Sequence, residues 1–210
     1  MKGVVFDFNG TLLSDTDIHE VAWRNYIQEL LNREITDEEF HSIHGRTNNL
    51  IMETFLEKEL TVAEGEKYSE EKEAVYRLKG QWSFFDYLKE QNIAINIATA
   101  SPKSNVEFYF ELFGLSRWFD LSKVVYNDGT LASKPAPDYY VQAAINVGIN
   151  PEEMWVFEDS PIGLQGAFNA KADKIIAVTT NDNRQALENI EFVDLLIDDY
   201  TDLRLHQLIK

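Results

Sequence analysis

The sequence predicts an α/β fold, in which a Rossmann-like parallel sheet is flanked by helices and carries an inserted all-helical domain. Three observations support this prediction. Short runs of Val, Ile, Leu and Phe recur along the chain, helical patterns separate most of them, and one long segment near the amino end has no strand pattern. Strands that alternate with helices form parallel sheets, and strands buried on both faces read as continuous apolar runs.

The apolar runs predict strands at residues 2–8, 93–100, 122–128, 153–159, 173–179 and 193–199. Two of these strands lead directly into a serine followed by a proline, at Ser101-Pro102 and at Ser160-Pro161. Serine is a favoured helix N-cap, and proline is favoured at the first helical position. We therefore expect a helix to begin at each pair, with its backbone N–H groups directed at an anion bound at the carboxyl edge of the sheet.

The core domain is predicted to comprise residues 1–13 and 81–210, with residues 14–80 as the helical domain inserted after the first strand. The first helix of the insertion is indicated by apolar residues at helical spacing, namely Ile18, Val21, Ala22, Ile27, Leu30 and Leu31. Movement of the insertion would require hinges where the chain enters and leaves it, near 13–15 and 80–82.

Later helices of the insertion follow from capping and spacing. Thr36 and Glu39 form a capping box, which opens the second helix. Further helices are expected over 48–59 and 69–79, and the polar stretch 61–73 is interpreted as the connection between them. The insertion is therefore predicted to be helical throughout.

Composition excludes several classes of function. The chain has 210 residues, 19 Lys and Arg against 36 Asp and Glu, a formal net charge of −17 and no cysteine. This charge repels nucleic-acid phosphates, and the lack of cysteine excludes disulfides, thiol catalysis and cysteine zinc sites. No apolar run reaches membrane-spanning length, and the amino end lacks the pattern of a signal peptide. We expect a cytoplasmic monomer that acts on a small molecule.

Polar residues follow the predicted strands at positions that meet on one edge of a parallel sheet. They are Asp7 and Asn9 after the first strand, Thr99, Ala100 and Ser101 at the second, Lys134 after the third, and Glu158 and Asp159 after the fourth. Open parallel sheets bind ligands at this edge. Clustered carboxylates suit Mg²⁺, and a lysine with helix N-termini suits a phosphoryl group. Asp198 and Asp199, by contrast, are interpreted as a solvated strand end.

Four short motifs occupy these strand ends in order: DFNGT at 7–11, IATAS at 97–101, SKPAPD at 133–138 and FEDSPIG at 157–163. In order and spacing they resemble the four motifs of the haloacid dehalogenase superfamily. The insertion at 14–80 resembles the helical C1-type cap of its beta-phosphoglucomutase and phosphoglycolate-phosphatase-like members. Each motif alone is common, but four in order on predicted strand ends form a specific pattern that covers essentially the whole chain.

The resemblance implies a role for each residue. Asp7 would be the nucleophile, which forms an aspartyl-phosphate. Thr99 and Lys134 would hold the transferring phosphoryl group, together with backbone amides near Phe8, Asn9 and Ala100. The Mg²⁺ ligands would be Asp7, the backbone carbonyl of Asn9, Glu158 and Asp159, directly or through water.

Asn9 departs from the family pattern. The family residue at this position also carries a carboxyl group that protonates the leaving oxygen and then activates water, and an amide cannot transfer a proton in this way. General acid–base help contributes about 10²–10⁴-fold in rate. We therefore expect Mg²⁺ and phosphate to bind, with turnover reduced most for poor leaving groups such as alkoxides.

Residues near the insertion offer other side chains for the site. Asp15, Asp17 and His19 lie close enough in sequence to supply a substitute acid. His19 stands in an H-x-x-x-W pattern that resembles the cap-hinge histidine of beta-phosphoglucomutase, although an exposed histidine on an amphipathic helix gives the same pattern. Arg46, in the loop HGRT, is expected either to pair with a substrate anion or to be a solvated turn charge.

The leading hypothesis is a Mg²⁺-dependent phosphatase of a small phosphorylated metabolite such as a sugar phosphate. One alternative is a beta-phosphoglucomutase-like phosphomutase, against which Asn9 counts because a mutase depends on proton exchange at that position. A phosphonate hydrolase would need a Schiff-base lysine, for which Lys58 and Lys67 are available without a supporting motif. The chain could also be a non-catalytic phosphometabolite binder or an engineered Asp-to-Asn variant.

Overall fold

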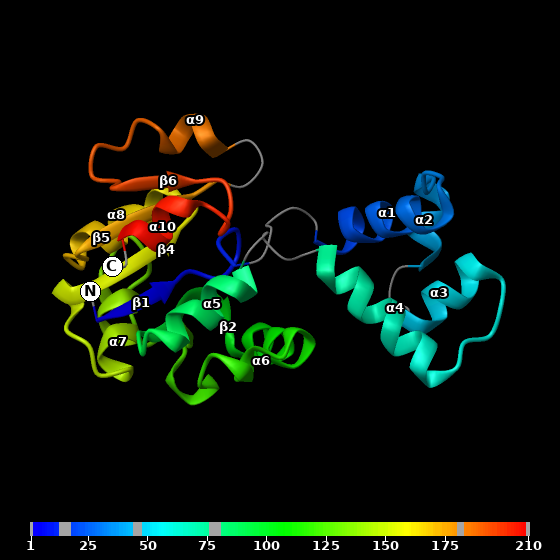
Figure 1. Ribbon diagram of the computed structural model, residues 1–210, viewed down its shortest axis with the longest axis horizontal. Helices are drawn as coiled ribbons and strands as arrows, with labels where there is room; N and C mark the ends of the chain where they lie inside the picture. Colours follow the sequence, from blue (N-terminus) through cyan, green and yellow to red (C-terminus); the bar gives the residue numbers. More distant parts are fainter. Residues whose placement is uncertain (1, 13–17, 44–47, 76–80, 180–182, 209–210) are drawn as a thin grey trace. The chain divides into compact units, whose positions relative to one another are not determined.

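The computed structural model describes residues 2–12, 18–43, 48–75, 81–179 and 183–208. The chain forms two compact units (Figure 1). Unit 1 comprises Met1–Asp15 and Leu78–Lys210, and unit 2 comprises Thr16–Arg77. Among the described helices, none is both long and apolar enough to cross a membrane.

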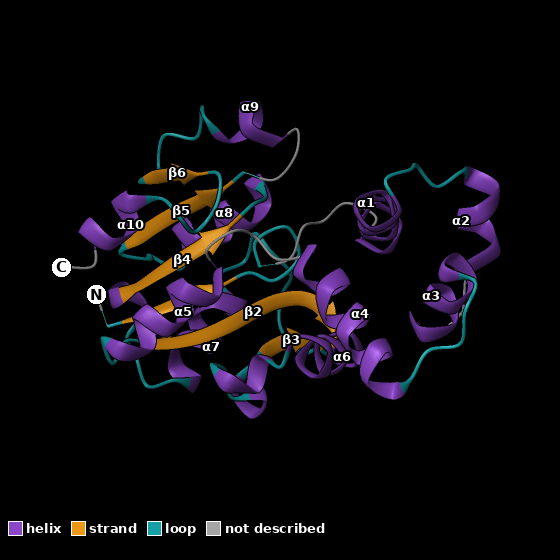
Figure 2. Ribbon diagram, turned by 45° about the vertical axis from the view of Figure 1, so that its right-hand side comes forward, coloured by secondary structure: helices purple, strands orange, loops and turns teal. Residues whose placement is uncertain are grey.

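Unit 1 is built on one parallel sheet, so the predicted fold class is confirmed (Figure 2). Its described strands are β1 (Gly3–Phe6), β2 (Ala94–Pro102), β3 (Val125–Asn127), β4 (Met154–Glu158), β5 (Lys174–Val178) and β6 (Leu195–Ile197). Their order across the sheet is β3-β2-β1-β4-β5-β6, and every neighbouring pair is parallel. Each predicted strand is present, because fully buried parallel strands leave an unbroken apolar signal in the sequence.

Helices cover both faces of this sheet. They are α5 (Gln81–Glu90), α6 (Lys103–Phe113), α7 (Asp138–Asn146), α8 (Pro161–Asn169), α9 (Arg184–Leu187) and α10 (Leu203–Leu208). Successive side chains of β1 point to opposite faces. Val5 joins the buried cluster that includes Tyr140 of α7 and Leu164 of α8. Phe6 lies edge-on to the ring of Phe85 in α5, with 5.2 Å between ring centroids.

The two predicted Ser-Pro helix starts have different outcomes. At Ser160 the prediction is confirmed, because its hydroxyl accepts a hydrogen bond from the Gly163 N–H and α8 begins at Pro161. At Ser101 it is wrong. Strand β2 continues through Pro102, which pairs with Asn127 of β3, so α6 begins only at Lys103 and has no side-chain cap. The Ser101 hydroxyl is therefore available for another contact.

Unit 2 is helical over its described residues, with α1 (Ile18–Leu31), α2 (Asp37–Ile43), α3 (Asn48–Leu56) and α4 (Val62–Val75). Its own buried cluster consists of Tyr26, Ile27, Ile35, Phe40, Ile43, Ile51 and Met52. Of the apolar residues whose spacing predicted α1, Ile27 is buried and Leu30 is 37% exposed. The capping box at Thr36 is confirmed, since its hydroxyl accepts from the Glu39 N–H and its N–H donates to the Glu39 carboxylate.

Helix α4 begins well before the predicted position, and the polar stretch taken for a connection is helical. A second capping box explains the start: the Thr61 N–H donates to Glu64 Oε2 at 3.0 Å, and the Glu64 N–H donates to Thr61 Oγ1 at 3.3 Å. The sequence T-V-A-E carries this signal, but without an apolar stripe behind it the stretch resembles a loop.

Replacing Thr61 by Ala should destabilise the start of α4, because the Glu64 N–H loses its side-chain acceptor and the Glu64 carboxylate loses the hydrogen bond from the Thr61 hydroxyl. The expected loss in free energy of unfolding is about 1 kcal/mol, as measured for other caps. Urea denaturation followed by circular dichroism measures it, and Thr61→Ser, which keeps the hydroxyl, should remain near the wild type. Equal stability of all three proteins would contradict the capping role.

Candidate active site

The site residues lie where the strand order reverses. Asp7 directly follows β1, and its backbone N–H donates to the Phe157 carbonyl of β4 at 2.9 Å. Thr99 lies in β2, on the other side of β1, and Glu158 is the last residue of β4. Crevices at the carboxyl ends of strands at such a reversal are where open α/β sheets bind ligands.

These residues surround one cavity of about 480 Å³. Its lining consists of Asp7, Asn9, Thr99, Ala100, Ser101, Pro102, Lys134, Glu158, Asp159 and Ser160. The structure thus brings together residues from four separate motifs, each from the end of a different strand or the loop after it. Phe8 does not line the cavity with its side chain, which is buried with its ring centroid 5.1 Å from that of Tyr109.

Lys134 is the cation at the centre of this site. Its Nζ lies 2.5 Å from Asp7 Oδ1 and 2.7 Å from Glu158 Oε2, and its side chain is only 10% exposed. The third carboxylate, Asp159, accepts a hydrogen bond from Thr11 Oγ1 at 3.2 Å. One buried lysine therefore stands among three carboxylates, and the cluster as a whole is anionic.

The close packing of these charged groups raises the pKa of two of the carboxyl groups and lowers that of the third. Burial, reinforced by the charge of Glu158, raises the pKa of Asp7 from 3.8 to about 7, although Lys134 opposes the rise. Burial and the charges of Glu158 and Asp7 raise the pKa of Asp159 from 3.8 to about 8. Burial also opposes ionisation of Glu158, but Lys134 and the hydrogen bonds from Tyr140 and Ser160 together outweigh it and hold the pKa of Glu158 below its ordinary value.

The donor set fits a divalent cation. One oxygen from each of Asp7, Glu158 and Asp159 lies within 4.8 Å of the other two, and the raised pKa values show that negative charge here lacks compensation. Hard cations such as Mg²⁺ take carboxylate and carbonyl oxygens as ligands. A bound cation would favour the ionised forms of Asp7 and Asp159.

Two glycines allow the carboxylates to sit where they do. Gly10 has a φ of +80°, and a Cβ built there would lie 1.9 Å from Asp159 Oδ2. At Gly163, in the first turn of α8, a Cβ would lie 2.0 Å from Glu158 Cδ. Only a residue without a side chain lets Glu158 approach the N-terminus of α8, where its Oε1 accepts from the backbone N–H groups of Asp159 and Ser160.

Asn9 contacts Ser101, which the sequence predicted to be a helix N-cap. The Ser101 hydroxyl, not used as a helix cap, donates to Asn9 Oδ1 at 3.2 Å. The Ser101 N–H donates to Thr99 Oγ1 at 3.1 Å. The extra residues of β2 thus turn Ser101 toward the cavity, where it orients the amide of Asn9.

Sequence reasoning missed several supporting residues. The Tyr140 hydroxyl donates to Glu158 Oε2, Asn183 Nδ2 donates to the Asp159 carbonyl at 2.9 Å, and the Tyr200 hydroxyl donates to the Thr11 carbonyl at 3.0 Å. Tyr140 and Tyr200 are buried, and both lie outside the four motifs, Tyr140 in α7 just after SKPAPD and Tyr200 between β6 and α10. Nothing in the sequence distinguishes them from ordinary core aromatics.

Other predicted residues cannot be placed in the site. Arg46, Asp15 and Asp17 lie outside the described residues, as do most of the predicted hinge positions. His19 belongs to α1 in unit 2. Leu12 precedes the insertion and Gln81 follows it. Gln81 Nε2 donates to the Leu12 carbonyl at 2.8 Å, so a buried hydrogen bond joins the two segments of unit 1 that flank the insertion.

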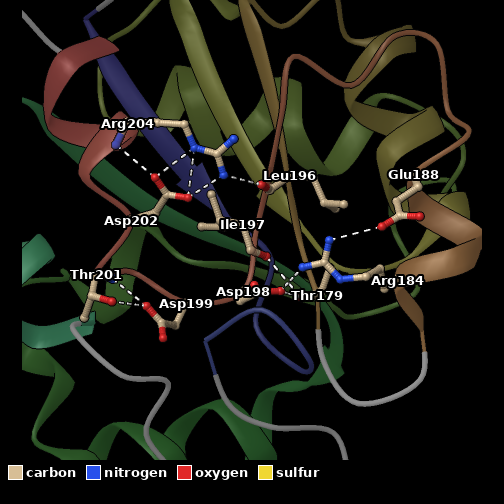
Figure 3. Close-up of polar contacts among 10 residues, drawn as sticks. All are labelled: Thr179, Arg184, Glu188, Leu196, Ile197, Asp198, Asp199, Thr201, Asp202 and Arg204. Carbon is tan, nitrogen blue, oxygen red and sulfur yellow. Dashed lines mark hydrogen bonds and ion pairs between the residues drawn. The ribbon is translucent and has the colours of Figure 1, made fainter.

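A second cavity of about 480 Å³ lies beside α9 and β6, and its cations are already paired (Figure 3). Arg184 contacts Glu188 at 3.1 Å and also Asp198, while Arg204 binds Asp202 and the Leu196 carbonyl. Both arginines therefore support the end of the sheet. Asp198 is exposed, as predicted, and it also accepts a hydrogen bond from Thr179 at 2.6 Å.

Fold and site together define a class: an open parallel α/β protein with a cluster of three carboxylates that could hold a cation, and a buried lysine, at the strand reversal. Residues 4–194 match the haloacid dehalogenase-like hydrolase family. The chain belongs to this family, as the motifs predicted.

Solved and curated relatives agree with this assignment. A HAD hydrolase of family IA, variant 3, from Entamoeba histolytica is 32% identical, with a TM-score of 0.68 over 100% of this chain and 98% of that one. A phosphorylated carbohydrates phosphatase from Thermotoga maritima is 26% identical over 90% of this chain and 91% of its own. A fructose-1-phosphate phosphatase from Escherichia coli is 26% identical over 82% of this chain and 94% of its own.

The raised pKa values predict how the stability of the metal-free protein depends on pH. Between about pH 4 and 8 the folded protein keeps protons on Asp7 and Asp159 that the unfolded chain has released, so the free energy of unfolding should fall as pH rises through this range. Thermal melting in a chelator between pH 5.5 and 8.5 measures this. A melting temperature that rises across the range would contradict the assignment.

Two comparisons isolate the carboxyls from other titrating groups. Asp159→Asn should flatten the upper part of the profile, since its own titration near pH 8 is removed. Mg²⁺ should raise the melting temperature more at pH 8 than at pH 6, because at lower pH the cation must displace protons from its ligands.

Proposed function

We propose that the protein is a Mg²⁺-dependent phosphatase of a small phosphorylated metabolite, with sugar phosphates as the favoured class. The observation that carries this proposal is the convergence of Asp7, Lys134, Asp159 and Thr99 on one cavity. The curated relatives support the substrate class, because they include phosphatases of phosphorylated carbohydrates and of fructose-1-phosphate.

The chemistry begins with Asp7. Its carboxylate attacks phosphorus, the bond from phosphorus to the ester oxygen breaks, and the ester oxygen leaves with the electron pair. Lys134 and the hydroxyl of Thr99 hold the phosphoryl oxygens, on which negative charge is distributed in the transition state. Water then attacks the phosphoryl group, the bond to Asp7 breaks, and inorganic phosphate is released.

The cation would be held by Asp7, Asp159 and the backbone carbonyl of Asn9, with Glu158 nearby. When bound, Mg²⁺ supplies positive charge that offsets the carboxylates and stabilises the transferring phosphoryl group. The ionised form of Asp7 is the one able to attack, and a bound cation would favour this form over the protonated one.

Asn9 sets the range of leaving groups. Its amide can donate a hydrogen bond to the departing oxygen but cannot transfer a proton, so the leaving oxygen must be stable as an anion or be protonated by solvent. Acyl and aryl phosphates should therefore react faster here than alkyl phosphates, and turnover of an alkyl phosphate such as a sugar phosphate should be limited by protonation of its leaving oxygen. The same limitation disfavours a phosphomutase, which would have to protonate and deprotonate a sugar hydroxyl in every cycle.

Asn9→Asp should raise kcat for an alkyl phosphate by about 10²–10⁴-fold, the usual contribution of a general acid–base group. The gain for 4-nitrophenyl phosphate should be much smaller, because its leaving group needs little protonation. Release of inorganic phosphate with and without Mg²⁺ measures both rates. Equal gains for the two substrates would contradict the role given to Asn9.

Asp7→Asn in both backgrounds is the matched control, because it removes the nucleophile while keeping a side chain of the same size. It should abolish the activity on both substrates. If the wild type and Asn9→Asp both bind phosphorylated sugars with Mg²⁺ but release no phosphate, the protein is a binder and the phosphatase proposal is wrong.

A further inference from the structure

Tyr140 is a buried side chain that the proposed reaction does not use. It comes from α7 and is fully buried, and its hydroxyl donates to Glu158 Oε2. The Nζ of Lys134 also lies 4.9 Å from the centre of the Tyr140 ring, close enough for a cation–π contact. One tyrosine thus contacts both the lysine and a carboxylate of the candidate site.

The Glu158 carboxylate is saturated by protein donors. Its Oε1 accepts from the Asp159 N–H, the Ser160 N–H and the Ser160 hydroxyl, at 3.2, 3.0 and 2.8 Å. Its Oε2 accepts from Lys134 at 2.7 Å and from Tyr140. Five donors meet a group that offers about four lone-pair positions. A cation would therefore have to displace a protein donor to reach Glu158.

Tight packing holds this arrangement in place. A Cβ at Gly166 in α8 would lie 3.2 Å from Tyr140 Cε2, so the ring lies directly against that helix. Gly163, one turn earlier in α8, provides the space for Glu158. The donors are thus fixed before any ligand binds, because the Tyr140 ring and the Glu158 carboxyl group are both packed against α8.

We infer that Tyr140 is a positioning residue, which commits Glu158 to Lys134 and keeps it from binding the metal ion directly. Asp7 and Asp159 are then the carboxylates that coordinate the cation. Lys134, held by Glu158 and by the Tyr140 ring, stays directed at Asp7, where the phosphoryl group is transferred. This inference rests on the proposed function for the role of Lys134, but its account of Glu158 concerns cation binding alone.

Tyr140→Phe tests the inference, because it removes the hydroxyl and keeps the ring against α8. With a lone pair released, Glu158 can turn to the cation, so the Kd for Mg²⁺ should fall by about threefold or more. At the same time Lys134 loses its alignment, and kcat for 4-nitrophenyl phosphate should fall about tenfold, the scale of one hydrogen bond to a charged group, with KM nearly unchanged. Calorimetric titration of the metal-free protein with Mg²⁺ alone measures the first effect.

Tyr139→Phe is the matched control, since it removes the hydroxyl of the neighbouring buried tyrosine, which does not line the cavity. It should leave Mg²⁺ affinity and kcat near the wild-type values. Weaker Mg²⁺ binding in Tyr140→Phe, or affinity unchanged from the control, would overturn the inference. Because the calorimetric result needs no turnover, tighter Mg²⁺ binding in a protein without phosphatase activity would refute the proposed function and still support the placement of Glu158.

Discussion

The ion pairs of Lys134 are the interaction on which the rest of the site depends. Three carboxylates occupy a space only a few ångströms across at the end of a buried sheet, where like charges repel strongly and water is scarce. Lys134 contacts Asp7 and Glu158 directly and thereby permits their close approach. Asp159 has no such partner among the described residues, and burial together with the charges of Glu158 and Asp7 raises the pKa of its carboxyl group to about 8. A bound cation would complete the neutralisation that the lysine begins.

The sheet keeps this charge cluster from dispersing. Asp7 and Glu158 lie at the ends of adjacent parallel strands, whose backbones are paired along their length. The neighbouring residues Val5 and Phe6 are fixed from opposite faces by α7 and α8 and by α5. Repulsion between the carboxylates is thus opposed by a core that cannot relax without losing buried apolar surface. The same rigidity makes the site preorganised for a transferring phosphoryl group.

At Asn9, cation binding and proton transfer depend on different groups, the backbone carbonyl and the side chain. Its backbone lies in the turn after β1 and is independent of the side chain, so an amide in place of a carboxyl need not disturb a cation held by the carbonyl. Its side-chain oxygen accepts from the Ser101 hydroxyl, and a carboxylate oxygen would accept from it equally well. The substitution therefore changes the chemistry available to the leaving group and leaves the surrounding hydrogen bonds intact. Asn9 is for this reason a position where activity can change without loss of the fold.

Several elements followed from the sequence because their signals are local. Each buried strand is a continuous apolar run, and Ser160-Pro161 carries its own helix cap. Asp7 directly follows β1, Glu158 ends β4, and Thr99 lies in the second half of β2. Local signals failed where long-range pairing decided the outcome. Ser101 is not a cap because Pro102 pairs with β3, and the polar start of α4 lacks the apolar stripe that would distinguish a helix from a loop.

The sequence by itself thus determined the strands, the parallel sheet and the residues that meet at its carboxyl edge. The reason is that the hydrophobic pattern of a strand, and the residues that follow it, are properties of short segments. Only the tertiary structure decided which ion pairs and hydrogen bonds the charged side chains of the site form. That Lys134 lies between Asp7 and Glu158, and that Tyr140 of α7 donates to Glu158 of β4, depends on how separate elements of the fold pack against one another. A hydrogen bond between side chains is made or lost when the donor–acceptor distance changes by a few tenths of an ångström. The sequence pattern does not encode differences of this size.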